Sequence, residues 1–309
     1  MRKKVEAMPN LSLDRSASHE AISASSMDSL IQRPSTASRF LRSPSVLLGA
    51  AIVIALILIA IFAPAISPYD PIKQSFKIQL QPPSAQHIFG TDEFGRDILS
   101  RVFHGARWAL FVGFLADSIA LVFGVTLGLL AGYYGGWLDG VIRWFTDVML
   151  AFPYLLLAMI VVAVLGPGIT NAMIAVGVVY MPQYIRLVRG TVLSIREQEY
   201  VEAARCVGIS PMRIIFRHVL PNCIAPIIVM ATLAIGWAIV ETAGLSFLGL
   251  GAQPPMPEWG AMLSSGRNYM LTAWWIATFP GLAILVVVIG FNVMGDGLRD
   301  VLDPYLKRR

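Results

Sequence analysis

The sequence predicts an all-α polytopic membrane protein with six transmembrane helices, and composition is the first observation that supports this fold class. Charged residues make up 14% of the 309 residues and apolar residues 56%, whereas about a quarter of a soluble domain is charged. A hydrocarbon core about 30 Å thick needs roughly 20 helical residues to cross it. Apolar stretches of adequate length lie near residues 46–63, 108–132, 143–165, 172–189, 222–249 and 273–294.

The distribution of basic residues supports the weakest of these stretches, 172–189, which contains Pro182 and Arg186. With six spans and the N-terminus in the cytoplasm, 18 of the 24 Lys and Arg residues lie inside and six outside. Without the fourth span, nine would lie inside and 15 outside. Because cytoplasmic loops carry an excess of Lys and Arg, this bias favours six spans with both termini in the cytoplasm.

The segments outside the spans differ in composition. The Ser-rich N-terminal segment has too few apolar residues to offset the entropy of ordering, so we expect a disordered cytoplasmic tail. In the first outward loop, Thr91 is expected to cap a short surface helix with Asp92 and Glu93 in its first turn. A later outer loop, "GAQPPMPEWG", contains three prolines, and Trp259 suits the membrane interface.

The expected organisation is a tail (1–44), a first, uncleaved transmembrane helix (45–65), an extracytoplasmic loop (66–105), a five-helix domain (106–297) with a charged loop (194–221), and a cytoplasmic C-terminal tail (298–309).

The charged loop contains "EYVEAARCVGISPMRIIFRHVLP", residues 199–221, between two apolar stretches. Ser194 and Glu197 have the spacing of a capping box, which predicts a helix start near residue 195. Gly208 is a natural left-handed C-cap for this helix, and Ser210 and Pro211 then begin a second one. The sequence therefore predicts two short helices joined at a glycine.

The second of these helices has an amphipathic pattern, with Arg213 and Arg217 on the polar face. Two interpretations remain open for the helix pair: an interfacial element on anionic lipid, or a knob that binds a soluble partner. Ala203 and Ala204 favour the partner, because small side chains beside a glycine turn allow close backbone approach. The expected apolar face consists of Met212, Ile215, Phe216 and Val219.

The same loop resembles the cytoplasmic EAA loop of ATP-binding-cassette (ABC) importer permeases. The matching positions are Glu202, Ala203, Ala204, Gly208, Leu220 and Pro221. His218 departs from the pattern, which has isoleucine there. The resemblance implies a type I ABC importer permease fold in which this loop, with Ser210 and Pro211, forms a coupling helix pair that docks on a cytoplasmic ATPase.

Four further stretches resemble the dipeptide, oligopeptide and nickel branch of these permeases, in particular its shorter, C-type subunit. The resemblance implies a bacterial inner-membrane protein that pairs with a second permease, two ATPases and an extracytoplasmic solute-binding protein, with peptides as cargo. ATP and Mg²⁺ would be bound by the ATPases, and this chain would hold no cofactor, bind no nucleic acid and catalyse no reaction. The stretches are "GTDEFGRDILSRVFHGARWAL", "GLSFLGLGAQPPMPEWGAML", "TFPGLAI" and "FNVMGDGLRDVLDP".

Charges within or near the predicted spans are candidates for function, because an unpaired charge is costly there. Arg143 and Asp147 are four residues apart near a cytoplasmic span end, which predicts a structural ion pair on the helix surface. Asp117 and Glu241 have no basic residue nearby in the sequence. Either one lines a wet solute pathway or bonds a neighbouring helix, and both alternatives stay open.

No metal site is expected. His87 and His104 are 17 residues apart on the outer side, a spacing that favours separate surface histidines over a nickel chelate. Cys206 and Cys223 do not have metal-ligand spacing. Asp296, Asp300 and Asp303 surround Arg299 and are interpreted as a solvated helix end. Trp108, Trp274 and Trp275 are interpreted as interfacial anchors at span ends.

Two other classes of function compete with the ABC permease. A secondary transporter or channel would usually show inverted repeats, broken helices or a ring of pore charges. A nickel-chelate importer would be an ABC permease that differs from a peptide importer only in its cargo. A membrane enzyme would need a nucleophile with a base, or a metal cluster, at bilayer depth. No Gly-rich phosphate-binding loop followed by Lys and Ser or Thr occurs in the sequence, so we expect any ATP hydrolysis to belong to another chain.

Overall fold

The computed structural model describes residues 43–302, which are helical with irregular loops and contain no β-strand. The N-terminal tail, apart from its last two residues, and Asp303 lie outside the described residues. The helices are α3 (Pro44–Ile66), α4 (Ile98–Tyr134), α5 (Gly136–Ala151), α6 (Tyr154–Leu165), α7 (Ile169–Arg196), α8 (Glu199–Cys206), α9 (Pro211–Ile214), α10 (Leu220–Phe247), α11 (Trp259–Gly266) and α12 (Trp275–Leu302), with a π-helical turn, Ile215–Val219, and two 3-10 turns, Phe76–Ile78 and Arg267–Tyr269.

Four continuous helical segments are long and apolar enough to cross a membrane: α3, α4, the segment Pro211–Phe247 and α12. The bent pair α5 and α6 makes a fifth if it is counted as one span. Helix α7 is 28 residues long and contains the predicted fourth stretch, but Gln183, Arg186 and Arg189 lower its apolar content. With α7 included, the architecture agrees with the predicted six-helix fold class.

The third predicted span, 143–165, is not one straight helix. It breaks at Phe152 and Pro153, and the axes of α5 and α6 differ by 101°. The cause is local, because proline disfavours helical backbone in the residue before it. Phe152 accordingly has an extended ψ of 142°, and Pro153 then precedes the first turn of α6.

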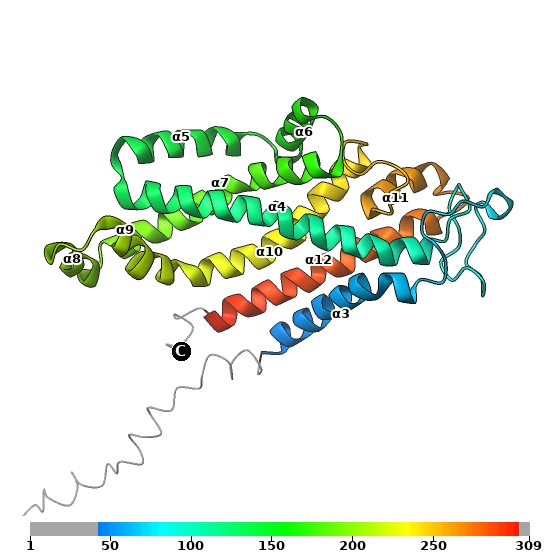
Figure 1. Ribbon diagram of the computed structural model, residues 1–309, viewed down its shortest axis with the longest axis horizontal. Helices are drawn as coiled ribbons and strands as arrows, with labels where there is room; N and C mark the ends of the chain where they lie inside the picture. Colours follow the sequence, from blue (N-terminus) through cyan, green and yellow to red (C-terminus); the bar gives the residue numbers. More distant parts are fainter. Residues whose placement is uncertain (1–42, 303–309) are drawn as a thin grey trace, which may run out of the picture. The chain divides into compact units, whose positions relative to one another are not determined.

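The long helices pack side by side along most of their lengths (Figure 1). Helix α4 lies along α7, and α12 lies between α3 and α10. Three glycines four residues apart on α4, Gly124, Gly128 and Gly132, allow the close approach of α7. A Cβ atom at Gly128 would lie 2.9 Å from the Cβ of Val188 on α7. Small residues at this spacing are typical of membrane helix interfaces.

The outer loops differ from the prediction at Thr91, which does not cap a helix. Residues 91–97 form a turn closed by an isolated bridge between Thr91 and Asp97. Asp97 caps α4 instead, accepting a hydrogen bond of 2.8 Å from the amide of Ser100. Helix α4 therefore begins at Ile98, ten residues before the predicted span.

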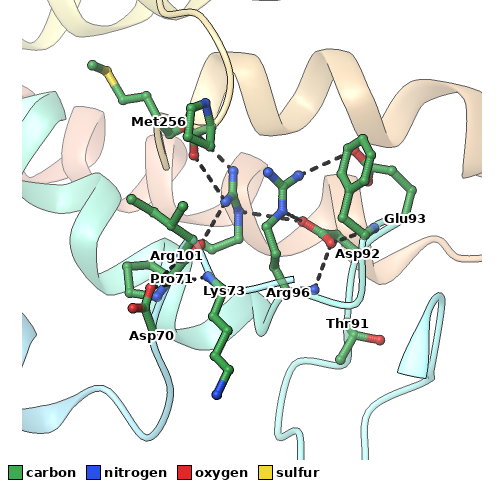
Figure 2. A network of polar contacts seen from close by, with 12 residues as sticks. Asp70, Pro71, Lys73, Thr91, Asp92, Glu93, Arg96, Arg101 and Met256 are labelled. Carbon is green, nitrogen blue, oxygen red and sulfur yellow. Dashed lines mark hydrogen bonds and ion pairs between the residues drawn. The ribbon is translucent and has the colours of Figure 1, made fainter. Parts of the chain in front are cut away.

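A buried charge network holds these loops together (Figure 2). The Nε of Arg96 lies 2.6 Å from the carboxylate of Asp92, and both side chains are 4% exposed. Arg101 lies 3.7 Å from the same carboxylate and donates a 2.8 Å hydrogen bond to the carbonyl of Pro71. Arg101 also reaches the carbonyl of Pro255 at 3.4 Å. This arginine therefore joins the first outer loop to the proline-rich loop.

Two tryptophans and a histidine predicted at the surface are buried in this region. Trp259 is 2% exposed and donates a hydrogen bond to the carbonyl of Val102. Trp275 is 6% exposed and donates to the carbonyl of Thr91. His87 is also buried, with its Nδ1 2.9 Å from Asp97. The sequence prediction failed here because these side chains fill the contacts between loops distant in sequence.

Candidate functional site

The candidate site is the loop between α7 and α10, at the end of the bundle where α8 and α9 lie (Figure 1). The predicted capping box is wrong, because Ser194 lies within α7, which continues to Arg196. Helix α8 begins at Glu199 after Gln198, with no side-chain cap. Arg196 donates a 3.0 Å hydrogen bond to the carbonyl of Gly132, so α7 stays bound to α4 at its end.

Gly208 ends α8 as predicted, with a left-handed φ of +77°. The amide of Gly208 bonds the carbonyl of Arg205 at 3.0 Å, and the amide of Ile209 bonds the carbonyl of Ala204 at 3.1 Å. These two bonds form a Schellman motif, which satisfies the last carbonyls of a helix and reverses the chain sharply. The bend between α8 and α9 is therefore a defined turn.

The second helix begins at Ser210 and Pro211 as predicted, but it is not a separate short helix. Helix α9, the π-helical turn and α10 follow one another without a loop, so Pro211–Phe247 forms one helical segment of 37 residues. Leu220 and Pro221 lie at the start of α10. Helix α9 is therefore continuous with a membrane-spanning helix.

The inner face of the loop is packed against the membrane helices. Val201 and Ala204 from α8, with Ile214 and Val219 from the second segment, are buried in one apolar cluster. The cluster also contains Leu129 of α4, Val188 and Val192 of α7, Ile215, and Cys223 and Ile227 of α10. Arg205 also lies 5.3 Å from the ring centroid of Tyr133 at the end of α4. The loop is thus fixed to α4, α7 and α10 by apolar packing.

The four residues of the predicted apolar face of the second helix divide between two environments. Ile215 and Val219 are buried, whereas Met212 and Phe216 are exposed, and Ile214 takes a buried position instead. The π-helical turn at Ile215–Val219 shifts the side chains relative to a regular helix, which the 3.6-residue period did not anticipate.

The outer face of the loop combines apolar side chains with charges. Val207 is 76% exposed, Phe216 59% and Met212 53%. Glu202, Ala203, Arg205, Arg213 and Arg217 are exposed on the same loop. Exposed apolar side chains accompanied by charged ones are typical of a protein interaction surface. The sequence pattern placed Met212 and Phe216 on the apolar face of the second helix and gave Val207, directly before the glycine turn, no role.

The charged residues in or near the spans differ in their burial and in their hydrogen-bond and ion-pair partners. Asp117 is buried and accepts a hydrogen bond from the Tyr184 hydroxyl, which joins α4 to α7. Glu241 is half-buried on α10. Arg143 lies 3.9 Å from Asp147, and Arg186 of α7 lies 3.5 Å from the same carboxylate, a partner that sequence reasoning missed.

No group of three or more His, Cys, Asp or Glu side chains with metal-binding geometry occurs among residues 43–302. His87 bonds Asp97, and the Nδ1 of His104 lies 3.2 Å from the hydroxyl of Ser67 and 3.0 Å from the carbonyl of Ser100. The two histidines therefore have separate structural partners.

Comparisons with known proteins agree with this geometry. Residues 124–308 match the family described as "Binding-protein-dependent transport system inner membrane component", and residues 35–83 match the "N-terminal TM domain of oligopeptide transport permease C". A dipeptide transport system permease protein DppC from Alkalihalophilus pseudofirmus is 54% identical over 261 residues, which cover 84% of this chain and 86% of the relative. A di/tripeptide transport system permease protein DppC from Pseudomonas aeruginosa is 47% identical over 274 residues, covering 87% and 90%.

Among solved structures, a chain of the MetNI methionine ABC transporter in inward-facing conformations superposes with a TM-score of 0.55 at 19% identity. The match covers 66% of this chain and 97% of that chain, and it shows a shared fold. The long helices, the glycine-hinged loop and these sequence matches together establish that the chain belongs to the binding-protein-dependent transport system inner membrane component family, as a permease subunit of an ABC importer.

Proposed function

We propose that this chain is the C-type permease of a peptide importer, and that the loop 199–221 is the docking site for a cytoplasmic ATPase. The names of its relatives support peptides as the cargo, since they include permeases for dipeptides, di/tripeptides and glutathione. The observation that carries the proposal is the continuous helical segment Pro211–Phe247, which begins in the exposed loop and crosses the bundle.

The loop is suited to transmit movement because its two faces have different roles. Val201, Ala204 and Val219 anchor the inner face to the membrane helices. Val207, Met212 and Phe216 are left exposed on the outer face, where an apolar cleft of a partner would bury them. An ATPase that closes on this surface would move α9 and α10 together.

The charge distribution supports a cytoplasmic position for this loop. Arg205, Arg213 and Arg217 lie on it, and the cytoplasmic side of membrane proteins is enriched in basic residues. The proposed assembly contains this chain, a second permease, two ATPases that bind ATP and Mg²⁺, and an extracytoplasmic solute-binding protein. The N- and C-termini are then cytoplasmic.

The test is uptake of a labelled dipeptide into proteoliposomes containing the complete assembly, with ATP available to the ATPases. We expect uptake that requires ATP, and its loss when the ATPases are omitted. Glu202→Lys should weaken retention of the ATPase by the purified permease pair, since it reverses a charge on the exposed face of α8. Uptake driven by an ion gradient without ATP would refute the proposal.

A further inference from the structure

Polar and charged side chains of α5, α6, α7 and α10 lie near one another on the bundle, beside exposed apolar side chains of α5 such as Trp144 and Val148. Gln183 of α7 donates a 2.6 Å hydrogen bond to the hydroxyl of Tyr154 on α6. Gln183 and Arg186 are three residues apart, so they share one face of α7. This surface, here called the polar face, consists of Arg143, Asp147, Tyr154, Gln183, Arg186 and Glu241.

Glu241 belongs to the polar face through its neighbours. Tyr180, one helical turn before Gln183, stacks on Tyr154 with ring centroids 5.7 Å apart. Gly244, three residues after Glu241, lies beside Leu155 of α6. Within residues 43–302, Glu241 has no hydrogen bond or ion pair, although it is half-buried on a membrane-spanning helix.

The break between α5 and α6 lies on the same surface. Residues 151–154 are exposed in the single chain, and they interrupt the helix after 16 residues of α5, about 24 Å along its axis at 1.5 Å per residue. Non-helical backbone at membrane depth is tolerated only where it is covered by protein or lines a water-filled cavity. Lipid therefore does not cover this break.

Other exposed surfaces of the bundle are apolar. On α3, Leu48, Ile54 and Ile61 are 56–62% exposed, and on α12 Leu282 and Leu285 are 48% and 51% exposed. By contrast, the side chains of Arg143 and Arg186 are each 65% exposed and that of Asp147 is 57% exposed. The apolar surfaces suit lipid, whereas the polar face needs water.

We propose that the polar face lines the aqueous route by which the solute crosses the membrane between this chain and the second permease. This inference rests on the proposed function. The group of Arg143, Asp147 and Arg186 carries a net positive charge toward the inner end of α7, and the carboxyl group of Glu241 lies beyond it. A cationic group and a separate carboxyl group can bind the two ends of a zwitterionic solute such as a short peptide.

The test measures water access at single introduced cysteines in the permease pair with its ATPases, assembled in nanodiscs without solute-binding protein. A cationic methanethiosulfonate reagent is added, and mass spectrometry identifies the labelled residue, which separates each site from native Cys206 and Cys223. Gln183→Cys and Arg186→Cys should react at least about tenfold faster than Leu285→Cys, because only a hydrated thiol readily forms the reactive thiolate.

Gln74→Cys, in the exposed first outer loop, is the positive control, and buried Cys223 is the internal negative control. The proposal is overturned if both Gln183→Cys and Arg186→Cys react no faster than Leu285→Cys, which would place the polar face against the second permease or lipid. The labelling needs neither peptide nor ATP hydrolysis. A failed labelling test with normal ATP-driven peptide uptake would therefore refute this inference alone, and failed uptake by the unmodified assembly would refute the proposed function.

Discussion

At the scale of single residues, the turn in the loop 199–221 depends on the backbone of Gly208. Its φ of +77° lies in the left-handed region, and a Cβ atom added there would meet no atom within 4 Å. A substitution therefore acts through backbone strain, since the space is open. For an L-residue this conformation costs roughly 1–2 kcal/mol, less for asparagine and more for β-branched residues.

We expect Gly208→Val to leave the helices inserted but to reduce peptide uptake per ATP hydrolysed. Gly208→Asn is the matched control, because asparagine tolerates left-handed backbone and should keep most of the coupling. The ratio of uptake to ATP hydrolysis in proteoliposomes measures the effect. Equal ratios for the valine and asparagine variants would show that the turn geometry does not matter.

A second residue-scale prediction concerns Glu258, which caps α11 in the outer region. Its side chain is buried, and its oxygens accept hydrogen bonds of 2.9 and 2.8 Å from the amides of Gly260 and Ala261. Burial raises the pKa of this carboxyl above its usual 4.5, even though these bonds act in the opposite direction. The folded state therefore holds the proton more tightly than the unfolded state does.

The stability that Glu258 contributes is fully present below pH 4.5 and is lost as the pH rises through the raised pKa. Glu258→Gln should remove this part of the pH dependence. Thermal denaturation of the purified permease pair between about pH 4.5 and 8 measures it, because linkage ties the slope to proton binding. Asp70→Asn is the control, since backbone hydrogen bonds lower the pKa of exposed Asp70 and its own effect falls below this window. An identical pH slope for Glu258→Gln and the unmodified chain would contradict the prediction.

At the scale of elements, the contact between α4 and α7 depends on glycine at three positions on α4. We expect Gly128→Leu to destabilise the folded chain by about 1–3 kcal/mol, the usual cost of overpacking. The reason is that its Cβ would lie 2.9 Å from Val188 and 3.0 Å from the carbonyl of Ile185.

Gly190→Leu on α7 is the matched control for this prediction. A Cβ at Gly190 meets no atom within 4 Å, so the same side chain fits there without overlap. Thermal unfolding of the purified chain in detergent compares the two variants. If both have the same midpoint, close packing at Gly128 is not important for stability.

The helices and turns also show which structural features could be predicted from the sequence. Apolar length located the spans, and the glycine turn at Gly208 was predicted because few other residues adopt a left-handed backbone. The bend at Phe152 and Pro153 was missed, although a proline in a candidate span is a recognised signal for it. The capping box at Ser194 failed because α7 packs against α4 beyond that residue, and tertiary packing overrides a local capping preference.

Long-range contacts explain the remaining errors. Trp259 and Trp275 are typical of interfacial anchors by type and position, but here their indoles bond carbonyls of Val102 and Thr91 across the outer loops. The pairing of Arg186 with Asp147 joins residues 39 positions apart. No local pattern in the sequence reports such contacts.

At the scale of the whole molecule, the permease has two proposed working surfaces. The outer face of the loop 199–221 is proposed to bind the ATPase, and the polar face is proposed to line the solute route. The segment Pro211–Phe247 connects them, because it begins in the loop and carries Glu241 in its last third. Because this segment is continuous, an ATPase bound to the loop would move the helix that carries Glu241 without contacting the proposed solute route.

Site-specific photo-cross-linking can show whether a separate ATPase binds the loop 199–221. A benzophenone amino acid replaces Phe216, which is 59% exposed, in cells that produce the whole assembly. The same substitution at Phe76, 66% exposed in the first outer loop, is the matched control. We predict a covalent product between position 216 and the ATPase, and none between position 76 and the ATPase. Cross-linking of position 216 to the solute-binding protein, or no ATPase product at this position, would contradict binding of the ATPase to this loop.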